Sequence, residues 1–152
     1  MENHLTAYVM VGAPGAGKST YAHKLAETAN AVIISGDSIR AELYGDESNQ
    51  GQWSEIQDRI EEMVSEAVGC PLVMDGTHYR RDYRRQALTL LQSYGYENVE
   101  AVVVNPDLET CILRNATRHR HVPRHVIQRM HDALQSSLRG IEDEGFTQVT
   151  YI

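Results

Sequence analysis

Residues 12–19 read Gly12-Ala13-Pro14-Gly15-Ala16-Gly17-Lys18-Ser19, and this octapeptide matches G-x-x-x-x-G-K-[ST] at every fixed position. An apolar segment precedes it and an amphipathic segment follows it, as expected for a loop between a strand and a helix. Glycines allow the backbone to turn so that successive N–H groups point at phosphate oxygens. The following helix N-terminus adds the positive end of its dipole. The stretch predicts a phosphate-binding loop, with a glycine-rich turn that binds nothing as the alternative.

Two side chains of this loop carry charge or ligate metal. Lys18 is expected to supply a cation for the β- and γ-phosphates of a nucleoside triphosphate, and the Ser19 hydroxyl is expected to ligate Mg²⁺. Thr20 and the whole of residues 12–19 are assigned to nucleotide binding. The guanine-specifying pattern Asn-Lys-x-Asp is absent from the sequence, so ATP is the expected nucleotide by elimination.

Outward from this loop, strand and helix patterns alternate along the chain, which is typical of a parallel sheet with helices on both faces. The expected class is α/β: a P-loop NTPase with three α/β/α layers, a mostly parallel sheet of about five strands and a helical lid at about 114–125. One domain is expected over residues 1–152. The expected strands are 5–11, 31–35, 72–75, 99–104 and 146–152. The expected helices are 21–29, 37–44, 53–68 and 81–94, with two more opened by Pro106 and Pro123. Trp53 and Tyr83 are assigned to apolar stripes of their helices.

The charge is negative overall but uneven. The net charge of −7 argues against broad attraction to nucleic acid or anionic lipid. Residues 37–66 hold nine acids and two arginines, whereas residues 78–129 hold nine arginines and five acids. The two isolated cysteines favour reduced thiols, the start of the chain lacks the basic pattern of a signal peptide, and no membrane contact is expected. These features together predict a cytoplasmic protein.

A carboxylate and an arginine follow the second expected strand. In doubly wound sheets, ligands bind at the carboxyl ends of the strands, so Asp37 is expected to face the γ-phosphate region. A carboxylate at that place can accept the proton of an attacking hydroxyl. Arg40 lies one helical turn further on and suits an acceptor phosphate or carboxylate. The alternative is that Asp37 only caps its helix and Arg40 only pairs with an acid.

A second polar group follows the third expected strand. Asp75 ends an apolar run, which is the form of a carboxylate that organises Mg²⁺, although it could equally lie toward the acceptor. Thr77 and His78 come next and are candidates to contact the acceptor. His78 is equally compatible with a position in a surface loop.

Arginines gather in two further places. Arg81 belongs to the cluster Arg80, Arg81, Arg84 and Arg85, which is either a basic wall beside the acceptor site or a solvated helix face. Arg114 and Arg118 are four apart at the edge of the expected lid. An arginine delivered by a lid can neutralise the charge that develops during phosphoryl transfer. The acidic run Glu142-Asp143-Glu144 is interpreted as a solvated turn.

These residues together resemble the kinase module of the polynucleotide 5′-hydroxyl kinases of phage and bacterial RNA end repair. More broadly, the chain is similar to the small P-loop kinases that include zeta-toxin-like and adenylylsulfate kinases. The resemblance covers about residues 8–134. It rests on Gly12–Ser19, Gly36-Asp37-x-x-Arg40, Asp75-Gly76-Thr77, and Arg114-x-x-x-Arg118 followed by Val122-Pro123.

The resemblance implies a role for each matching residue. Lys18 and Ser19 would hold ATP and Mg²⁺, Asp37 would be the general base on a 5′-hydroxyl, and Arg40 would hold the neighbouring phosphate of the acceptor. Arg118 would reach the donor phosphates from the lid, with Arg114 nearby at the nucleotide.

Three functions fit the sequence. The first is transfer of the γ-phosphate of ATP to the 5′-hydroxyl end of a polynucleotide. The second is a small-molecule kinase that acts on a hydroxyl of a nucleotide, sugar or antibiotic, which the acidic total charge favours. The third is an ATP-binding switch that transfers nothing and needs no base at Asp37.

Overall fold

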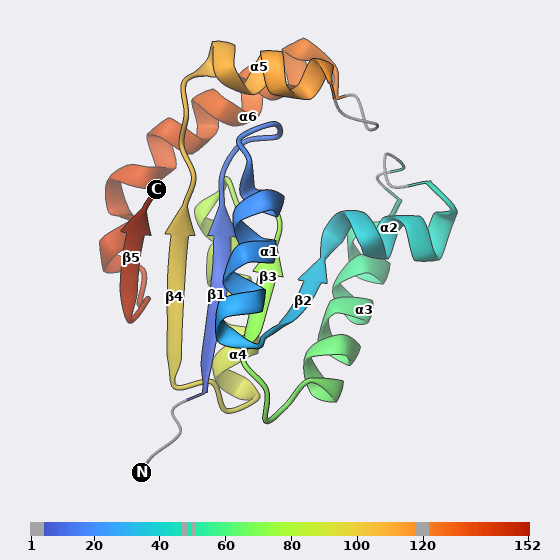
Figure 1. The fold of residues 1–152 in the computed structure, drawn as a ribbon, viewed down its shortest axis with the longest axis vertical. Helices are drawn as coiled ribbons and strands as arrows, with labels where there is room; N and C mark the ends of the chain where they lie inside the picture. The colour runs from blue at the N-terminus through green and yellow to red at the C-terminus, as the bar shows by residue number, and fades with distance from the viewer. Residues whose placement is uncertain (1–4, 47–48, 50, 118–121) are drawn as a thin grey trace.

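The computed structural model describes residues 5–46, 49, 51–117 and 122–152 (Figure 1). The expected alternation of strands and helices is confirmed. The elements in chain order are β1 (Thr6–Val11), α1 (Lys18–Ala29), β2 (Val32–Ser35), α2 (Gly36–Tyr44), α3 (Trp53–Glu66), β3 (Leu72–Asp75), α4 (Arg81–Ser93), β4 (Asn98–Val103), α5 (Leu108–Ala116), α6 (Arg124–Ser137), the 3-10 helix η1 (Leu138–Asp143) and β5 (Gln148–Tyr151).

The five strands form one parallel sheet in the order β2-β3-β1-β4-β5. All carboxyl ends therefore point to the same end of the molecule, where α5 and the start of α2 lie (Figure 1). The chain leaves β1 in the middle of the sheet and next fills the edge at β2. The loop after β1 consequently lies where the strand order reverses, which is the usual ligand site of such sheets.

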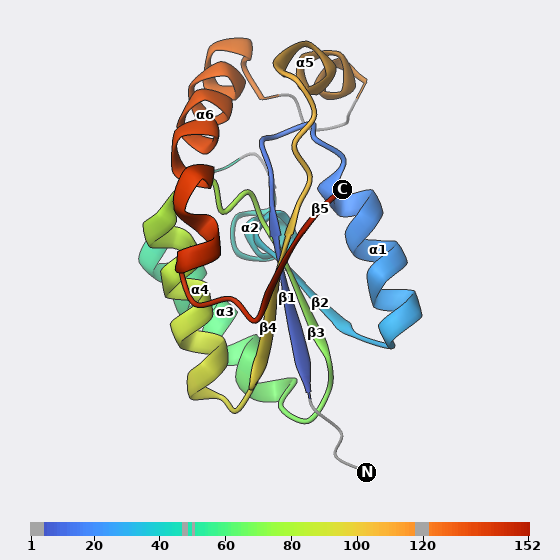
Figure 2. The same ribbon diagram turned by 90° about the vertical axis from the view of Figure 1, so that its left-hand side faces the viewer.

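Helices cover both faces of the sheet, which confirms the three-layer prediction. Figure 2 shows α1 on one face and α3 and α4 on the other. Successive residues of β1 serve the two faces in turn, because side chains alternate along a strand. Val9 packs into the core under α3 and α4, whereas Met10 packs into the core under α1 with Ala22.

Three boundaries of the helices bear on the site. Helix α1 begins at Lys18, three residues before the expected start at Tyr21, because Lys18, Ser19 and Thr20 form its first turn. Helix α2 begins at Gly36 directly after β2. Helix α5 ends at Ala116 and α6 begins at Arg124, so the central part of the expected lid, including Arg118, lies outside the described residues. Among the helices of the described part, none is long and apolar enough to cross a membrane.

Candidate active site

The phosphate-binding loop connects β1 to the N-terminus of α1. Gly15 has φ 81°, in the left-handed region that favours glycine. Gly12 passes so close to the residue after β4 that a Cβ atom there would lie 2.5 Å from the carbonyl oxygen of Val104. Gly17 caps α1 with φ 99° and contributes no side-chain hydrogen bond to the first turn. The backbone N–H groups of that turn thus face the loop, as anion binding at a helix N-terminus requires.

Lys18 and Ser19 point from the first turn of α1 toward the loop and β3. The Lys18 side chain is nearly buried, and its Nζ atom donates a hydrogen bond to the carbonyl oxygen of Ala13 at 3.0 Å. The Ser19 hydroxyl donates to Oδ2 of Asp75 at 2.9 Å. Asp75 ends β3, the strand that pairs directly with β1. Sheet pairing therefore brings together a hydroxyl and a carboxylate that are 56 residues apart in sequence.

These two oxygen ligands fit Mg²⁺. A hard, small cation prefers oxygen ligands and usually combines one or two carboxylates with substrate phosphates and waters. Within the described part of the chain, no group of three or more His, Cys, Asp or Glu side chains is arranged to enclose a metal ion. Ser19 and Asp75 thus suit a metal that is shared with a bound nucleotide, rather than one held by the protein alone.

Arg114 is the described member of the expected pair of lid arginines. It lies in the last turn of α5, and its Nη1 atom donates to the carbonyl oxygen of Ala16 at 2.7 Å. The same nitrogen lies 3.1 Å from where a Cβ atom on Gly17 would be. A guanidinium therefore lies against the phosphate-binding loop.

Asp37 and Arg40 lie on the first two turns of α2, at the carboxyl end of β2. Arg40 Nη1 is 3.4 Å from Asp37 Oδ1, and both side chains are partly exposed. The N-cap of α2 is Ser35, whose hydroxyl accepts a hydrogen bond from the Ser38 N–H at 3.3 Å. The part of the alternative in which Asp37 caps the helix is therefore wrong, whereas the part in which Arg40 pairs with an acid is seen, and that acid is Asp37 itself.

The segment after β3 is tied to the phosphate-binding loop. The Gly12 N–H donates to the carbonyl oxygen of Thr77 at 2.9 Å, and His78 Nδ1 donates to the carbonyl oxygen of Met10 at 2.7 Å. Burial lowers the pKa of His78 below its ordinary value, and nearby Lys18 also lowers it, whereas the hydrogen bonds to Met10 and Gly76 and the charge of Asp75 oppose the shift. His78 is therefore a partly buried residue of the cavity wall that is tied to β1, which favours a place in the site over one in an unattached surface loop.

Arg84 departs from both interpretations of the arginine cluster. Its side chain is fully buried and forms an ion pair with Glu144, with Nη2 to Oε2 at 2.7 Å and Nε to Oε1 at 2.8 Å. Its remaining donors bond to the carbonyl oxygens of His78 and Ser137 and to the Ser137 hydroxyl. Arg84 thus belongs neither to a solvated face nor to a basic wall.

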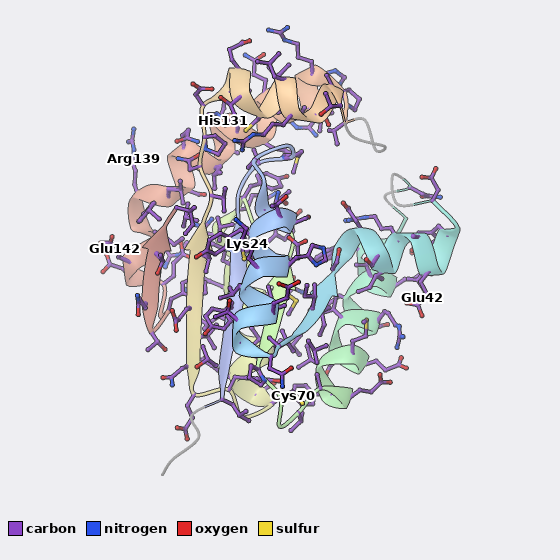
Figure 3. All side chains as sticks on the ribbon, viewed as in Figure 1. Lys24, Glu42, Cys70, His131, Arg139 and Glu142 are labelled. Atoms are coloured by element: carbon purple, nitrogen blue, oxygen red, sulfur yellow. The ribbon has the colours of Figure 1, made fainter. Side chains whose placement is uncertain are left out.

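Glu144 corrects the interpretation of the acidic run as a solvated turn. It is buried as the partner of Arg84, whereas Glu142 is exposed on the outer side of η1 (Figure 3). The predicted surface position of Glu144 is wrong because Arg84, the partner that compensates its buried charge, is 60 residues away in sequence.

A cavity of about 850 Å³ is lined by most of the residues that the sequence assigns to the site. Its walls include Pro14, Gly15, Gly17, Lys18, Ser19, Thr20, Asp37, Arg40, Asp75, Thr77, His78 and Arg114. The other residues of the loop, Gly12, Ala13 and Ala16, are buried and are not among the residues that line the cavity. Arg81 is exposed at the start of α4 and is not among the residues that line the cavity.

The sequence-based interpretation missed three aromatic residues in this wall, namely Trp53, Tyr79 and Tyr83. Trp53 was assigned to the apolar stripe of its helix, but it is 44 % exposed, whereas Ile56 on the same helix is buried. One signal was available. Trp53 is the first residue of α3 and follows a Gly-Gln pair, so its side chain lies at the end of the apolar stripe where the helix begins.

Together, the parallel sheet, the phosphate-binding loop after the central strand and the Ser19–Asp75 contact define an α/β fold of the P-loop NTPase type. A family model described as an AAA domain matches residues 8–137. The chain therefore belongs to this AAA domain family, whose match covers both the loop and the α5–α6 region. No curated protein sequence matches the chain.

Solved structures with the same fold include proteins of different kinds. The chain is similar to a protein in the Pnkp1/Rnl/Hen1 RNA repair complex, with 21 % identity, TM-score 0.74, and coverage of 91 % of this chain and 47 % of that one. It is similar to a protein of the PezAT toxin-antitoxin system of Streptococcus pneumoniae, with 21 % identity, TM-score 0.72, and coverage of 99 % and 67 %. A gluconokinase from Sinorhizobium meliloti 1021 matches with 19 % identity, TM-score 0.59, and coverage of 99 % and 83 %. The chain thus spans about half the length of the RNA repair protein. At these identities, the structural similarity shows a shared fold alone.

Proposed function

We propose that this protein is a kinase that transfers the γ-phosphate of ATP to a hydroxyl group. One observation carries the proposal: a phosphate-binding loop and a carboxylate–arginine pair line the same cavity. We call residues 12–20 with Asp75 and Arg114 the donor side. We call Asp37, Arg40 and residues 77–79 the acceptor side. A protein that only bound ATP would need the donor side alone.

In the proposed reaction, the acceptor oxygen attacks the γ-phosphorus. A new oxygen–phosphorus bond forms, the bond from that phosphorus to the β–γ bridging oxygen breaks, and ADP leaves. The proton of the acceptor hydroxyl passes to the Asp37 carboxylate. Lys18 and Arg114 stabilise negative charge on the donor phosphates, and Arg118 is predicted to join them. Mg²⁺, held by Ser19 and Asp75, would neutralise charge on the β- and γ-phosphate oxygens.

The acceptor that we favour is the 5′-hydroxyl end of a polynucleotide. Arg40 supports this acceptor. Its guanidinium lies beside Asp37, the proposed general base, where it suits the phosphate on the 3′ side of the terminal sugar. The aromatic side chains in the cavity wall offer surfaces on which nucleobases stack. A similar fold in a protein of an RNA repair complex is consistent with it.

A small hydroxyl compound is the second candidate. The specific observation in its favour is the acidic surface beside the acceptor side, where exposed Glu42 and Glu62 flank Arg59 between α2 and α3. Such a surface disfavours a long polyanion, because binding of nucleic acid depends on neutralising its phosphates.

The test is an acceptor screen with γ-labelled ATP and Mg²⁺. We expect label on DNA or RNA oligonucleotides that carry a 5′-hydroxyl and none on the matched 5′-phosphorylated oligonucleotides. The logarithm of the association constant for the oligonucleotide should fall linearly with the logarithm of the salt concentration, with a slope of about −0.7 per contacted phosphate. Transfer to a small alcohol but to no oligonucleotide, with almost no salt dependence, would contradict the polynucleotide acceptor and support the second candidate.

A further inference from the structure

A shallow groove of about 740 Å³ runs along α3 and α4 and meets the cavity at Trp53 and Tyr83. These two aromatic residues line both hollows. Further along, the groove is lined by polar and basic side chains, among them Gln57, Arg85 and Gln86. A chain whose end lies at Asp37 and Arg40 therefore has a continuous path out of the cavity, and this path crosses the two rings.

The rings form an ordered cluster. The Trp53 and Tyr83 ring centroids are 5.5 Å apart with an interplanar angle of 57°, and those of Tyr79 and Tyr83 are 5.7 Å apart at 58°. The Arg80 guanidinium carbon lies 5.4 Å from the Tyr83 ring centroid. Tilted pairs and a cation over a ring are favourable arrangements that hold the rings in place. Trp53 is thus positioned by its neighbours and still 44 % exposed, which is high for a tryptophan.

The chemistry around the rings suits a nucleobase. Aromatic side chains bind bases by stacking, whatever the base, because every base has a π face. The exposed guanidinium groups of Arg81 and Arg85 at the start of α4 supply positive charge near the groove for a phosphate backbone. Asp82 is also present, but its carboxylate is paired with Arg80 at 3.0 Å. The amides of Gln57 and Gln86 can donate to and accept from base edges.

Building on the proposed function, we infer that Trp53 and Tyr83 form a stacking platform for the base next to the terminal nucleotide of a single-stranded acceptor. The terminal nucleotide occupies the cavity with its hydroxyl at Asp37. The second base leaves the cavity at Trp53. The enzyme therefore prefers acceptors of two or more nucleotides over a nucleoside 3′-phosphate, and it requires an unpaired 5′ end, since a base in a duplex has no free face for the platform.

The first experiment measures kcat and KM of Trp53→Ala for two acceptors: a nucleoside 3′-phosphate and a short single-stranded oligonucleotide. Loss of one stacked base costs about 1–3 kcal/mol, so kcat/KM for the oligonucleotide should fall about 5- to 150-fold, mainly through KM. The value for the nucleoside 3′-phosphate should fall much less, because this acceptor has no second base to stack on Trp53. Trp53→Phe keeps a ring and should retain most of the activity. Tyr151→Ala is the matched control, since Tyr151 is 53 % exposed on β5 and belongs to neither hollow.

An abasic residue at the second position of the oligonucleotide gives the sharper test. In wild type it should lower kcat/KM as much as Trp53→Ala does, and in Trp53→Ala it should cause no further loss. Independent effects of the two changes would contradict stacking between them. Equal losses for both acceptors, or no loss for either, would also overturn the platform.

Fluorescence separates the platform from the proposed activity. Trp53 is the only tryptophan of the chain, so stacking of a base should quench the emission of the protein. We expect quenching by the oligonucleotide and not by the nucleoside 3′-phosphate, measured in Asp37→Ala to avoid turnover. Absence of quenching, with phosphate transfer to oligonucleotides intact in wild type, rejects the platform alone. Absence of transfer to any oligonucleotide in wild type rejects the proposed acceptor.

Discussion

The donor side and the acceptor side face the same cavity but are built in different ways. The donor side is largely one continuous segment, residues 12–20, whose shape is held by glycines and by backbone contacts. The acceptor side is assembled from α2 and from residues 77–79, and the aromatic platform adds residues of α3 and α4. The geometry of a continuous segment is set by its own residues. The geometry of an assembled wall depends on packing between elements that are distant in sequence.

The two sides also differ in how their charges are placed. On the donor side, Lys18 and Arg114 both donate to carbonyl oxygens of the loop itself, those of Ala13 and Ala16. On the acceptor side, a buried arginine does not line the cavity but binds the backbone of a residue that does. Arg84 donates to the carbonyl oxygen of His78, and the Ser137 hydroxyl donates to that of Tyr79 at 2.7 Å. The acceptor side is therefore supported by α4, α6 and Glu144, none of which contributes to the phosphate-binding motif.

Replacement of Asp37 should separate the two sides most strongly. Asp37→Ala should lower kcat by about 10²–10⁴, the usual contribution of a general base, and leave the ATP dissociation constant unchanged in calorimetry. Lys18→Ala is the counterpart and should weaken ATP binding itself. Loss of ATP binding in Asp37→Ala would contradict the division into sides. If neither wild type nor the variant transferred phosphate to any acceptor, the ATP-binding switch would be the better explanation.

Removal of the buried partner of Arg84 should show how much the acceptor side depends on packing. Glu144→Ala leaves a buried guanidinium without its carboxylate and should lower the free energy of unfolding by about 3–5 kcal/mol in urea denaturation. The exposed pair Arg80–Asp82 is the control, and Asp82→Ala should cost at most about 1 kcal/mol. Where Glu144→Ala remains folded, KM for the acceptor should rise more than KM for ATP. An equal rise in both would show that Glu144 supports the whole fold rather than the acceptor side.

On the donor side, Arg114→Ala should act in the opposite sense. A hydrogen bond to a charged group contributes about 1.5–3 kcal/mol, so affinity for ATP should fall about 10- to 150-fold while affinity for the acceptor stays the same. Arg124→Ala, which removes an exposed side chain at the start of α6, is the matched control and should change neither. An unchanged ATP affinity in Arg114→Ala would remove this residue from the donor side.

The smallest expected effect is at the junction of the two sides, where His78 bonds to Met10. Because the pKa of His78 is lowered in the folded protein, the unfolded chain binds the proton more tightly. Stability should therefore be fully present above about pH 6.5 and fall as the pH is lowered through that value, by up to about 1.4 kcal/mol per pH unit. His78→Asn tolerates the positive φ of 44° at this position and should reduce the pH dependence in thermal unfolding. The same slope in both proteins would assign it to other groups.

Much of the fold could be predicted from the sequence, because the relevant signals are local. The strand and helix boundaries agree with the structure to within a few residues, since hydrophobic periodicity and turn residues act over short segments. The loop of the donor side could be predicted for the same reason, because its glycines, Lys18 and Ser19 all lie within the short segment 12–19. Asp37 and Arg40 were placed correctly at a strand end because the carboxyl ends of parallel strands gather at one edge.

The rest depended on contacts between distant residues. The roles of Arg84 and Glu144 were wrong because burial of a charge depends on a partner that spacing does not reveal. Trp53 and Tyr83 fit the helical periodicity of core residues. Their rings nevertheless contact each other in the cavity wall rather than in the buried core. The spacing of His78 fits two positions, and its hydrogen bond to Met10 places it in the cavity wall.

By itself, therefore, the sequence determined a parallel α/β fold and a phosphate-binding loop, because a strand, a glycine-rich turn and a helix N-terminus are specified by neighbouring residues. Only the tertiary structure decided that Asp75 meets Ser19, that Arg114 lies against the loop and that aromatic rings border the acceptor side. The physical reason is that these contacts depend on the order of strands in the sheet and on the packing of helices against it, neither of which is encoded within a single segment.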